Sequence, residues 1–194
     1  MSESSQTKKK AFFSRSVIYL LMGTMVILLI TGCKKNNSDN SSKNGGTDGT
    51  SSASIVDTAS EFETAIGAKG TWIICLTKDL KIDKDLVVDG EFKNGKKDDS
   101  GKDIVQRKLA LYAQDDKRNI TARYTLTVPK LTIKSPNASL QHGKFVGDLI
   151  VDAANFQLVD NAVEGNIYFT SQEVKDTFTM DKTSTVSGVQ EIKK

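Results

Sequence analysis

The segment at 147–151 (GDLIV) is repeated 18 residues later at 165–169 (GNIYF). Both copies begin with glycine, continue with a polar residue and end in an apolar triplet. Further triplets with an apolar–x–apolar pattern occur at 131–133, 156–158 and 178–180, with offsets of 25 and 22 residues. A spacing of about twenty residues with this alternation is typical of parallel β-solenoids, in which short strands stack and inward side chains form columns.

The alternative is an antiparallel β-sandwich, whose strands also recur every ~8–12 residues. Within residues 55–194 a hairpin signal of the Asn-Gly type occurs only at Asn94-Gly95, and a sandwich gives no reason for the triplets to repeat. Unequal offsets suit a solenoid, because its turns vary in length while its strands stay in register. The sequence therefore predicts a mainly β fold, a parallel β-helix of about five or six rungs.

A short helix is predicted ahead of the repeats, at 58–66. Thr58 and Glu61 have the spacing of a capping box, in which a hydroxyl and a carboxylate satisfy the first free amides of a helix. Three apolar residues follow at helical spacing, and Gly67 ends the pattern. Strands are then expected within 71–76, 80–82 and 86–88, each bounded by turn residues, with almost no helix beyond them.

The order of a capped helix, a glycine, a strand (TWIICLTKDL) and a second strand ending in Asp-Gly (KIDKDLVVDG) resembles the start of right-handed β-helix proteins of the pectate-lyase-like superfamily. The resemblance covers about residues 56–190. It implies that the helix closes the N-terminal end of the core. Members of that superfamily include polysaccharide lyases and hydrolases as well as adhesins, so the fold alone does not decide the function.

The first 32 residues have the composition of a secretory signal peptide. Positions 1–15 are polar and basic, and Val17–Ile30 is an uncharged run whose roughly 21 Å length as a helix is short of the ~30 Å bilayer core. The following LITGC (29–33) resembles the lipobox of bacterial lipoproteins. The resemblance implies cleavage between Gly32 and Cys33, and diacylglycerol on the Cys33 sulfur. The alternative is a short membrane helix with an incidental cysteine.

The lipobox implies an extracytoplasmic protein held at the bacterial membrane by its acyl chains. Lys34 follows the lipidated position instead of aspartate, which in a diderm bacterium resembles release to the outer membrane. Residues 33–54 are predicted to be the lipidated cysteine and a polar tether, since 34–54 holds no apolar residue larger than alanine. Residues 55–194 are predicted to be one β-helix domain.

Charge separates the two parts of the chain. Residues 1–32 hold four of the 27 basic and one of the 24 acidic residues, so 23 of each remain beyond them. A neutral folded part argues against a nucleic-acid partner. Two cysteines are too few for a disulfide scaffold or a structural zinc site, and the sequence predicts no metal, no cofactor and no catalytic residue.

The candidate binding surface consists of Ile150 and Tyr168. Alternation places the middle residue of each apolar triplet on the outside, so both side chains are expected as exposed neighbours that contact a sugar ring or a partner protein. The alternative is that another segment covers them. The charged insertion at 91–103 (EFKNGKKDDSGKD) is expected to leave the coil as a long loop on the binding face.

The remaining residues that could take part in catalysis or metal binding have structural interpretations. His142 is expected in a solvated turn, because no nucleophile motif accompanies it. Cys75 is expected as a small buried apolar residue. The pairs Asp98-Asp99 and Asp115-Asp116 lie beside basic residues, as in solvated loops, and lack a calcium-binding pattern.

Three functions follow from these observations. The first is a lipid-anchored binding or structural component of the cell envelope, with envelope glycan or another surface protein as partner. The second is a carbohydrate-active enzyme, a polysaccharide lyase or hydrolase, which needs three or more carboxylates in a groove with a basic residue. The third is an accessory subunit of a surface protein complex.

Overall fold

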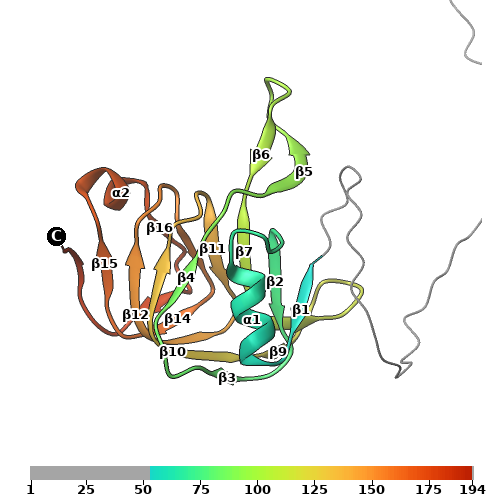
Figure 1. Ribbon diagram of the computed structural model, residues 1–194, viewed down its shortest axis with the longest axis horizontal. Helices are drawn as coiled ribbons and strands as arrows, with labels where there is room; N and C mark the ends of the chain where they lie inside the picture. The colour runs from blue at the N-terminus through green and yellow to red at the C-terminus, as the bar shows by residue number, and fades with distance from the viewer. Residues whose placement is uncertain (1–52, 194) are drawn as a thin grey trace, which may run out of the picture. The chain divides into compact units, whose positions relative to one another are not determined.

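The computed structural model describes residues 53–193 (Figure 1). This part is mainly β, with two large parallel sheets, two antiparallel hairpins and two short helices. The predicted signal peptide, the cleavage site at Gly32 and the lipidation site at Cys33 lie outside the described residues, as does most of the predicted tether.

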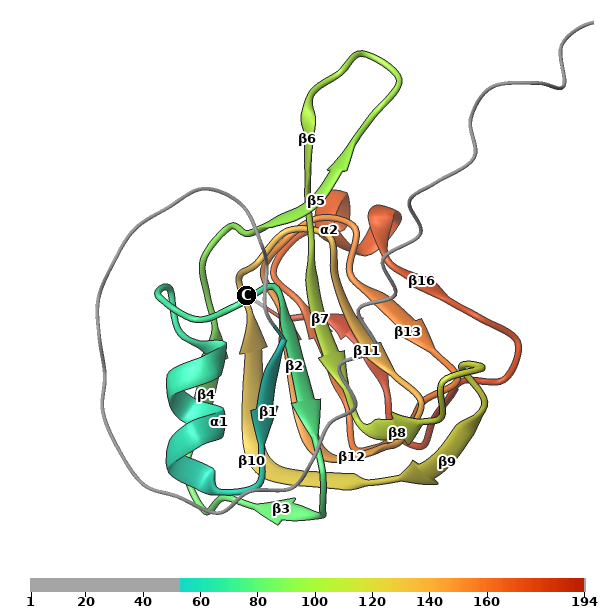
Figure 2. The same cartoon turned by 90° about the vertical axis from the view of Figure 1, so that its right-hand side faces the viewer.

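The first sheet, called sheet A, contains six parallel strands that lie side by side in Figure 2. Along the sheet they are β1 (Ser54–Val56), β2 (Ile73–Leu76), β7 (Arg107–Ala110), β11 (Ala138–Gln141), β13 (Gln157–Val159) and β16 (Thr179–Met180). Strand β1, which sequence analysis did not anticipate, pairs with β2 in parallel.

The second sheet, called sheet B, is formed by the segments that follow each strand of sheet A from β2 onward, whereas β1 is followed by helix α1. Its strands are β3 (Leu80–Lys81), β4 (Leu86–Val88), β10 (Thr125–Ile133), β12 (Lys144–Val151), β14 (Ala162–Glu164), β15 (Ile167–Phe169), β17 (Thr185–Val186) and β18 (Gln190–Ile192). The chain therefore passes alternately between the sheets, and every pairing within them is parallel.

The core lies between the two sheets and consists of columns of apolar side chains. In sheet A one column is formed by paired residues that are at most 1% exposed, namely Ile74, Leu109, Leu140 and Leu158. In sheet B the equivalent column is Val88, Ile133, Val151 and Phe169. Parallel pairing in register thus buries one side chain of each strand in such a column. This burial of apolar surface is the main contribution to the stability of the fold.

Helix α1 (Ala59–Ile66) begins and ends where the sequence predicts. Thr58 is its N-cap and forms the full capping box with Glu61, while Gly67 is its C-cap. The three predicted apolar residues, Phe62, Ala65 and Ile66, are buried in the core. Because α1 contacts β1, β2 and β4, it covers apolar surface at the first strands of both sheets.

A fully buried guanidinium holds the C-terminus of α1. Arg107 donates hydrogen bonds to the carbonyl oxygens of Ala65 (2.6 Å), Gly67 (3.2 Å) and Asp89 (3.0 Å), and lies 4.0 Å above the Phe92 ring. Burial lowers the pKa of Arg107 to about 10, opposed by the charge of Asp89, so the side chain stays charged at neutral pH. A cation placed on the last carbonyls of a helix also opposes the negative end of its dipole.

The strand register supports part of the predicted repeat and corrects the rest. Leu149–Val151 pairs with Ile167–Phe169, as the 18-residue repeat predicts. The triplet at 156–158 aligns with 178–180, since Gln157 pairs with Thr179 and Leu158 with Met180. The triplet at 131–133 belongs to sheet B, however, and does not align with 156–158. Both sheets use the same apolar–x–apolar pattern, so the pattern cannot show which sheet a triplet enters.

Three other elements differ from expectation. The insertion at 91–103 is a hairpin of β5 (Lys93–Lys97) and β6 (Asp103–Val105), and its turn lies at 98–101, not at Asn94-Gly95. A second hairpin, β8 (Tyr112–Gln114) with β9 (Ile120–Arg123), was not predicted. Nor was helix α2 (Gln172–Thr177), which Ser171 caps and which has no buried residue.

Glycines stack at the corner within sheet B. Gly147 and Gly165 have φ angles of +134° and +151°, which side chains rarely tolerate. A Cβ atom on Gly165 would lie 1.9 Å from the Gly147 carbonyl oxygen, and one on Gly188 would lie 2.5 Å from that of Gly165. The levels therefore approach each other so closely at this corner that only glycine fits.

We predict that Gly165→Ala lowers the free energy of unfolding by roughly 2–3 kcal/mol, through strain and the clash with Gly147. Urea unfolding followed by circular dichroism measures the change. Gly95→Ala is the matched control, because Gly95 also has a positive φ of +78° but has no atom within 4 Å of the added Cβ. Its cost should be only about 1 kcal/mol, and equal costs for the two variants would contradict the close-approach explanation.

Candidate functional site

The predicted binding residues lie on the outer face of sheet B. Ile150 pairs with Tyr168, and the same register continues to Thr132 and Val87 on one side and to Glu191 on the other. Ile150 and Tyr168 are both half-buried, whereas Val87 is 44% exposed. Parallel pairing thus aligns a row of outward side chains across five strands.

A shallow depression of about 360 Å³ is centred on this row. Ile150, Tyr168 and Thr132 form its floor, and Lys130 and Lys193 flank it. The Lys193 ammonium lies 4.3 Å from the centre of the Tyr168 ring, so the last described residue covers part of the aromatic face. Lys130 forms an ion pair with Asp85. We call these five lining residues the sheet B face.

A polar network that sequence analysis missed lies at the corner between the sheets. His142 Nδ1 lies 3.0 Å from Asp160 Oδ2, which also accepts a hydrogen bond of 2.6 Å from Arg123. The Tyr112 ring meets the His142 ring edge-on, with 4.6 Å between centroids. His142 is therefore not a simple solvated turn residue, since it is half-buried and held by partners. The positive φ angles of His142 and Asp160 have no marker in the sequence, as neither is a glycine.

The corner carboxylates are held ionised. Hydrogen bonds from His142 and then Arg123 keep the pKa of Asp160 below its ordinary value. The pKa of Asp181 is lowered to about 2, chiefly by the Ser184 hydroxyl, and its second oxygen accepts the amide of Asp160. No serine, threonine or cysteine among the described residues hydrogen-bonds to His142. The network therefore joins successive levels of the chain at this corner.

The prediction that Cys75 is a buried core residue is wrong. Cys75 lies on the outward side of β2, between the buried residues Ile74 and Leu76, and is half-buried instead of belonging to the core. Burial raises the pKa of its thiol, an effect that the charge of Lys108 opposes. The thiol thus stays protonated at neutral pH.

The acidic pairs serve local turns. Asp98 accepts hydrogen bonds from Ser100 and Lys102, and Asp115 accepts them from Lys117 and Asn119. These bonds lower the pKa of both carboxyls. Within the described residues, no three His, Cys, Asp or Glu side chains are grouped so as to hold a metal ion.

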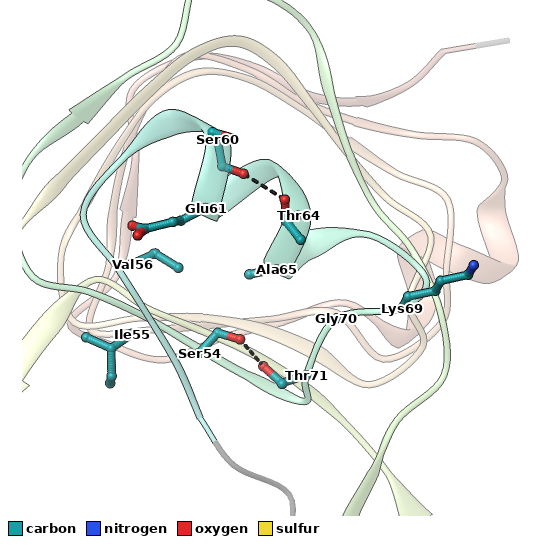
Figure 3. A pocket seen from close by; sticks show the side chains of 10 residues that line it. All are labelled: Ser54, Ile55, Val56, Ser60, Glu61, Thr64, Ala65, Lys69, Gly70 and Thr71. Atoms are coloured by element: carbon teal, nitrogen blue, oxygen red, sulfur yellow. Dashed lines mark hydrogen bonds between the residues drawn. The ribbon is translucent and has the colours of Figure 1, made fainter. Parts of the chain in front are cut away.

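A pocket of about 390 Å³ lies between α1 and β1 (Figure 3). Its polar side chains bond within the pocket wall: Thr64 donates to the Ser60 carbonyl, and the Ser54 and Thr71 hydroxyls lie 2.7 Å apart. Glu61 belongs to the capping box, and Lys69 points away from the other side chains. The pocket therefore lacks converging polar groups for a ligand.

Comparison with known proteins found no matching family model, curated protein or solved structure. Neither helix within residues 53–193 has the length and apolar composition needed to cross a membrane.

We predict that Asp181→Asn lowers the melting temperature at pH 6 and that the difference from wild type shrinks as the pH falls. The folded pKa of about 2 lies below the unfolded value of 3.8, so the carboxylate stabilises the fold above pH ~4 and loses this effect as the pH approaches 2. Melting curves of both proteins between pH 6 and pH 2.5 show whether the difference in melting temperature shrinks or grows in acid. Asp83→Asn, whose side chain is 83% exposed, is the control. A difference that grows in acid would refute the assignment.

Proposed function

We propose that this protein is a lipid-anchored, extracytoplasmic β-helix that binds a cell-envelope component through the sheet B face. The fold proposed for residues 53–193 is a right-handed parallel β-helix with α1 as its N-terminal cap. Its support is the alternation of the chain between two parallel sheets, together with the strong preference of parallel crossovers for the right hand. The anchor is proposed from the lipobox at 29–33, with Cys33 as the lipidated residue and Gly32 before the cleavage site.

The observation that carries the binding function is the registered row on sheet B. Outward positions of a strand are satisfied by threonine or lysine, yet here the paired residues Ile150 and Tyr168 are both apolar, and Val87 lies beyond Thr132 in the same row. Lys193 beside the Tyr168 ring and Lys130, which also lines the depression, add hydrogen-bond donors. An aromatic face with nearby polar groups suits the apolar side of a sugar ring and its hydroxyls, and an envelope glycan is therefore the proposed ligand.

We predict that Cys33→Ala moves the protein from the membrane fraction to the soluble fraction of cells. Two or three acyl chains anchor stably, and a chain that lacks them and has lost its leader has no lipid to hold it at the bilayer. Fractionation and mass spectrometry of the N-terminal peptide measure this, and the wild-type peptide should begin at an acylated Cys33. Cys75→Ala is the matched control and should stay at the membrane. Membrane retention, after alkaline washing, of Cys33→Ala protein from which the leader has been removed would refute the anchor.

We predict that Ile150→Ser combined with Tyr168→Ser weakens glycan binding by roughly tenfold or more, because the stacking surface is removed. Binding of the full chain in lipid nanodiscs to isolated peptidoglycan and a panel of cell-surface polysaccharides is the measurement. Val159→Ser is the control, since Val159 is also half-buried but is on the outer side of sheet A. Tyr168→Phe should retain binding through its ring.

Two outcomes would reject the sheet B face as a glycan site. One is equal binding by the wild-type and doubly substituted chains, and the other is no binding to any polysaccharide. Turnover of a polysaccharide with release of shorter products would instead favour the carbohydrate-active enzyme. Circular dichroism spectra of the variants establish that they fold.

A further inference from the structure

The outer side of sheet A changes character along the sheet. On β11, β13 and β16 its outward residues are mostly polar: Ser139, Gln141, Gln157 and Thr179, with Val159 as the exception. On β1, β2 and β7 they are mostly apolar: Ile55, Ile73, Cys75 and Ala110. The register groups these four side chains, because Ile55 pairs with Cys75 and Cys75 with Ala110.

The β8–β9 hairpin turns this apolar area into a groove. Strand β8 contacts β2, and Tyr112, Ala113 and Gln114 form one wall above the sheet. Ala110 is buried beneath it, but Ile55 remains 64% exposed, and Figure 3 shows its side chain pointing away from α1. The groove has a volume of about 390 Å³, which lies within the range of small-molecule sites.

One cation, Lys108, lines this mainly apolar groove. Lys108 is half-buried on β7, and its ammonium donates a hydrogen bond of 2.8 Å to the Tyr112 hydroxyl. None of the ion pairs within residues 53–193 involves Lys108. Two of its three N–H donors and the Tyr112 hydroxyl proton are thus available to an acceptor. A half-buried ammonium that has no carboxylate partner in the protein is stabilised when a bound ligand supplies the negative charge.

We propose that this groove binds an aliphatic carboxylate, whose alkyl chain lies over Ile55, Ile73 and Cys75 and whose carboxylate accepts hydrogen bonds from Lys108 and Tyr112. A single ammonium matches a single negative charge, and the apolar floor matches an unbranched chain. The groove lies on sheet A, and the site is independent of the sheet B face and of the proposed glycan.

Cys75 provides the test, because a bound alkyl chain shields its thiol. The full chain in zwitterionic nanodiscs is alkylated with a maleimide, and the rate at Cys75 is followed by peptide mass spectrometry. Octanoate should slow alkylation. Octanol and octylamine should be roughly tenfold less effective because they lack the charge that Lys108 binds, and butanoate roughly tenfold less effective because it buries fewer methylene groups.

Two variants assign the contacts. Lys108→Met keeps the aliphatic stem and should raise the octanoate concentration for half-protection about tenfold without changing that for octanol. Ile55→Ser should weaken protection by both ligands. Val87→Ser, an outward apolar residue of sheet B, is the matched control and should behave as wild type.

The ligand series uses the unaltered chain, so its outcome does not depend on the folding of a variant. The inference is overturned if octanoate leaves the Cys75 rate unchanged. Equal protection by octanol or octylamine would mean that the groove accepts any apolar chain, which also overturns it. The inference is also overturned if octanoate protects Cys75 equally well in the wild-type and Lys108→Met proteins.

Discussion

Parallel pairing in register places each strand of the two large sheets beside a strand from the previous passage of the chain. Neighbouring strands lie about 4.8 Å apart, so equivalent side chains form straight rows. Inward rows produce the columns of Ile74 to Leu158 and of Val88 to Phe169, and outward rows produce the sheet B face. A slip of one residue would exchange Tyr168 with Phe169 and expose the core, so the core and the proposed binding surface depend on one register.

This stack is held together at its first level and at its corners by polar groups. Arg107 fixes the carbonyl end of α1 over the first strands, and its burial is tolerated because three backbone oxygens accept from it. At the corner between the sheets, Asp160 and Asp181 connect successive levels through hydrogen bonds. At the corner within sheet B, stacked glycines allow the backbone of one level to contact the next.

Local signals in the sequence were sufficient for α1, because the capping box and the apolar spacing act within nine residues, and for the strands at 71–88. The 18-residue repeat also predicted the pairing of Ile150 with Tyr168 correctly. The predicted alignment of 131–133 with 156–158 was wrong, because both sheets use the same apolar–x–apolar pattern. The partners of His142 and the exposure of Cys75 depend on contacts with Asp160, Tyr112 and the β8–β9 hairpin, which pairwise spacing does not encode.

The two outward apolar regions differ in a way that separates their proposed ligands. On sheet B, Ile150 and Tyr168 lie in a shallow open depression, so a ligand there keeps one side in water, as a glycan does. On sheet A, the β8–β9 hairpin forms a wall beside Cys75 and Ala110, so an alkyl chain lying in the groove is partly removed from water. Partial burial favours an alkyl chain over a sugar, because sugar hydroxyls removed from water need polar partners, and the described side chains that line this groove supply them at Thr77, Lys108, Tyr112 and Gln114. The hairpin wall and the outward residues of sheet A beneath it therefore set the ligand class of the groove together.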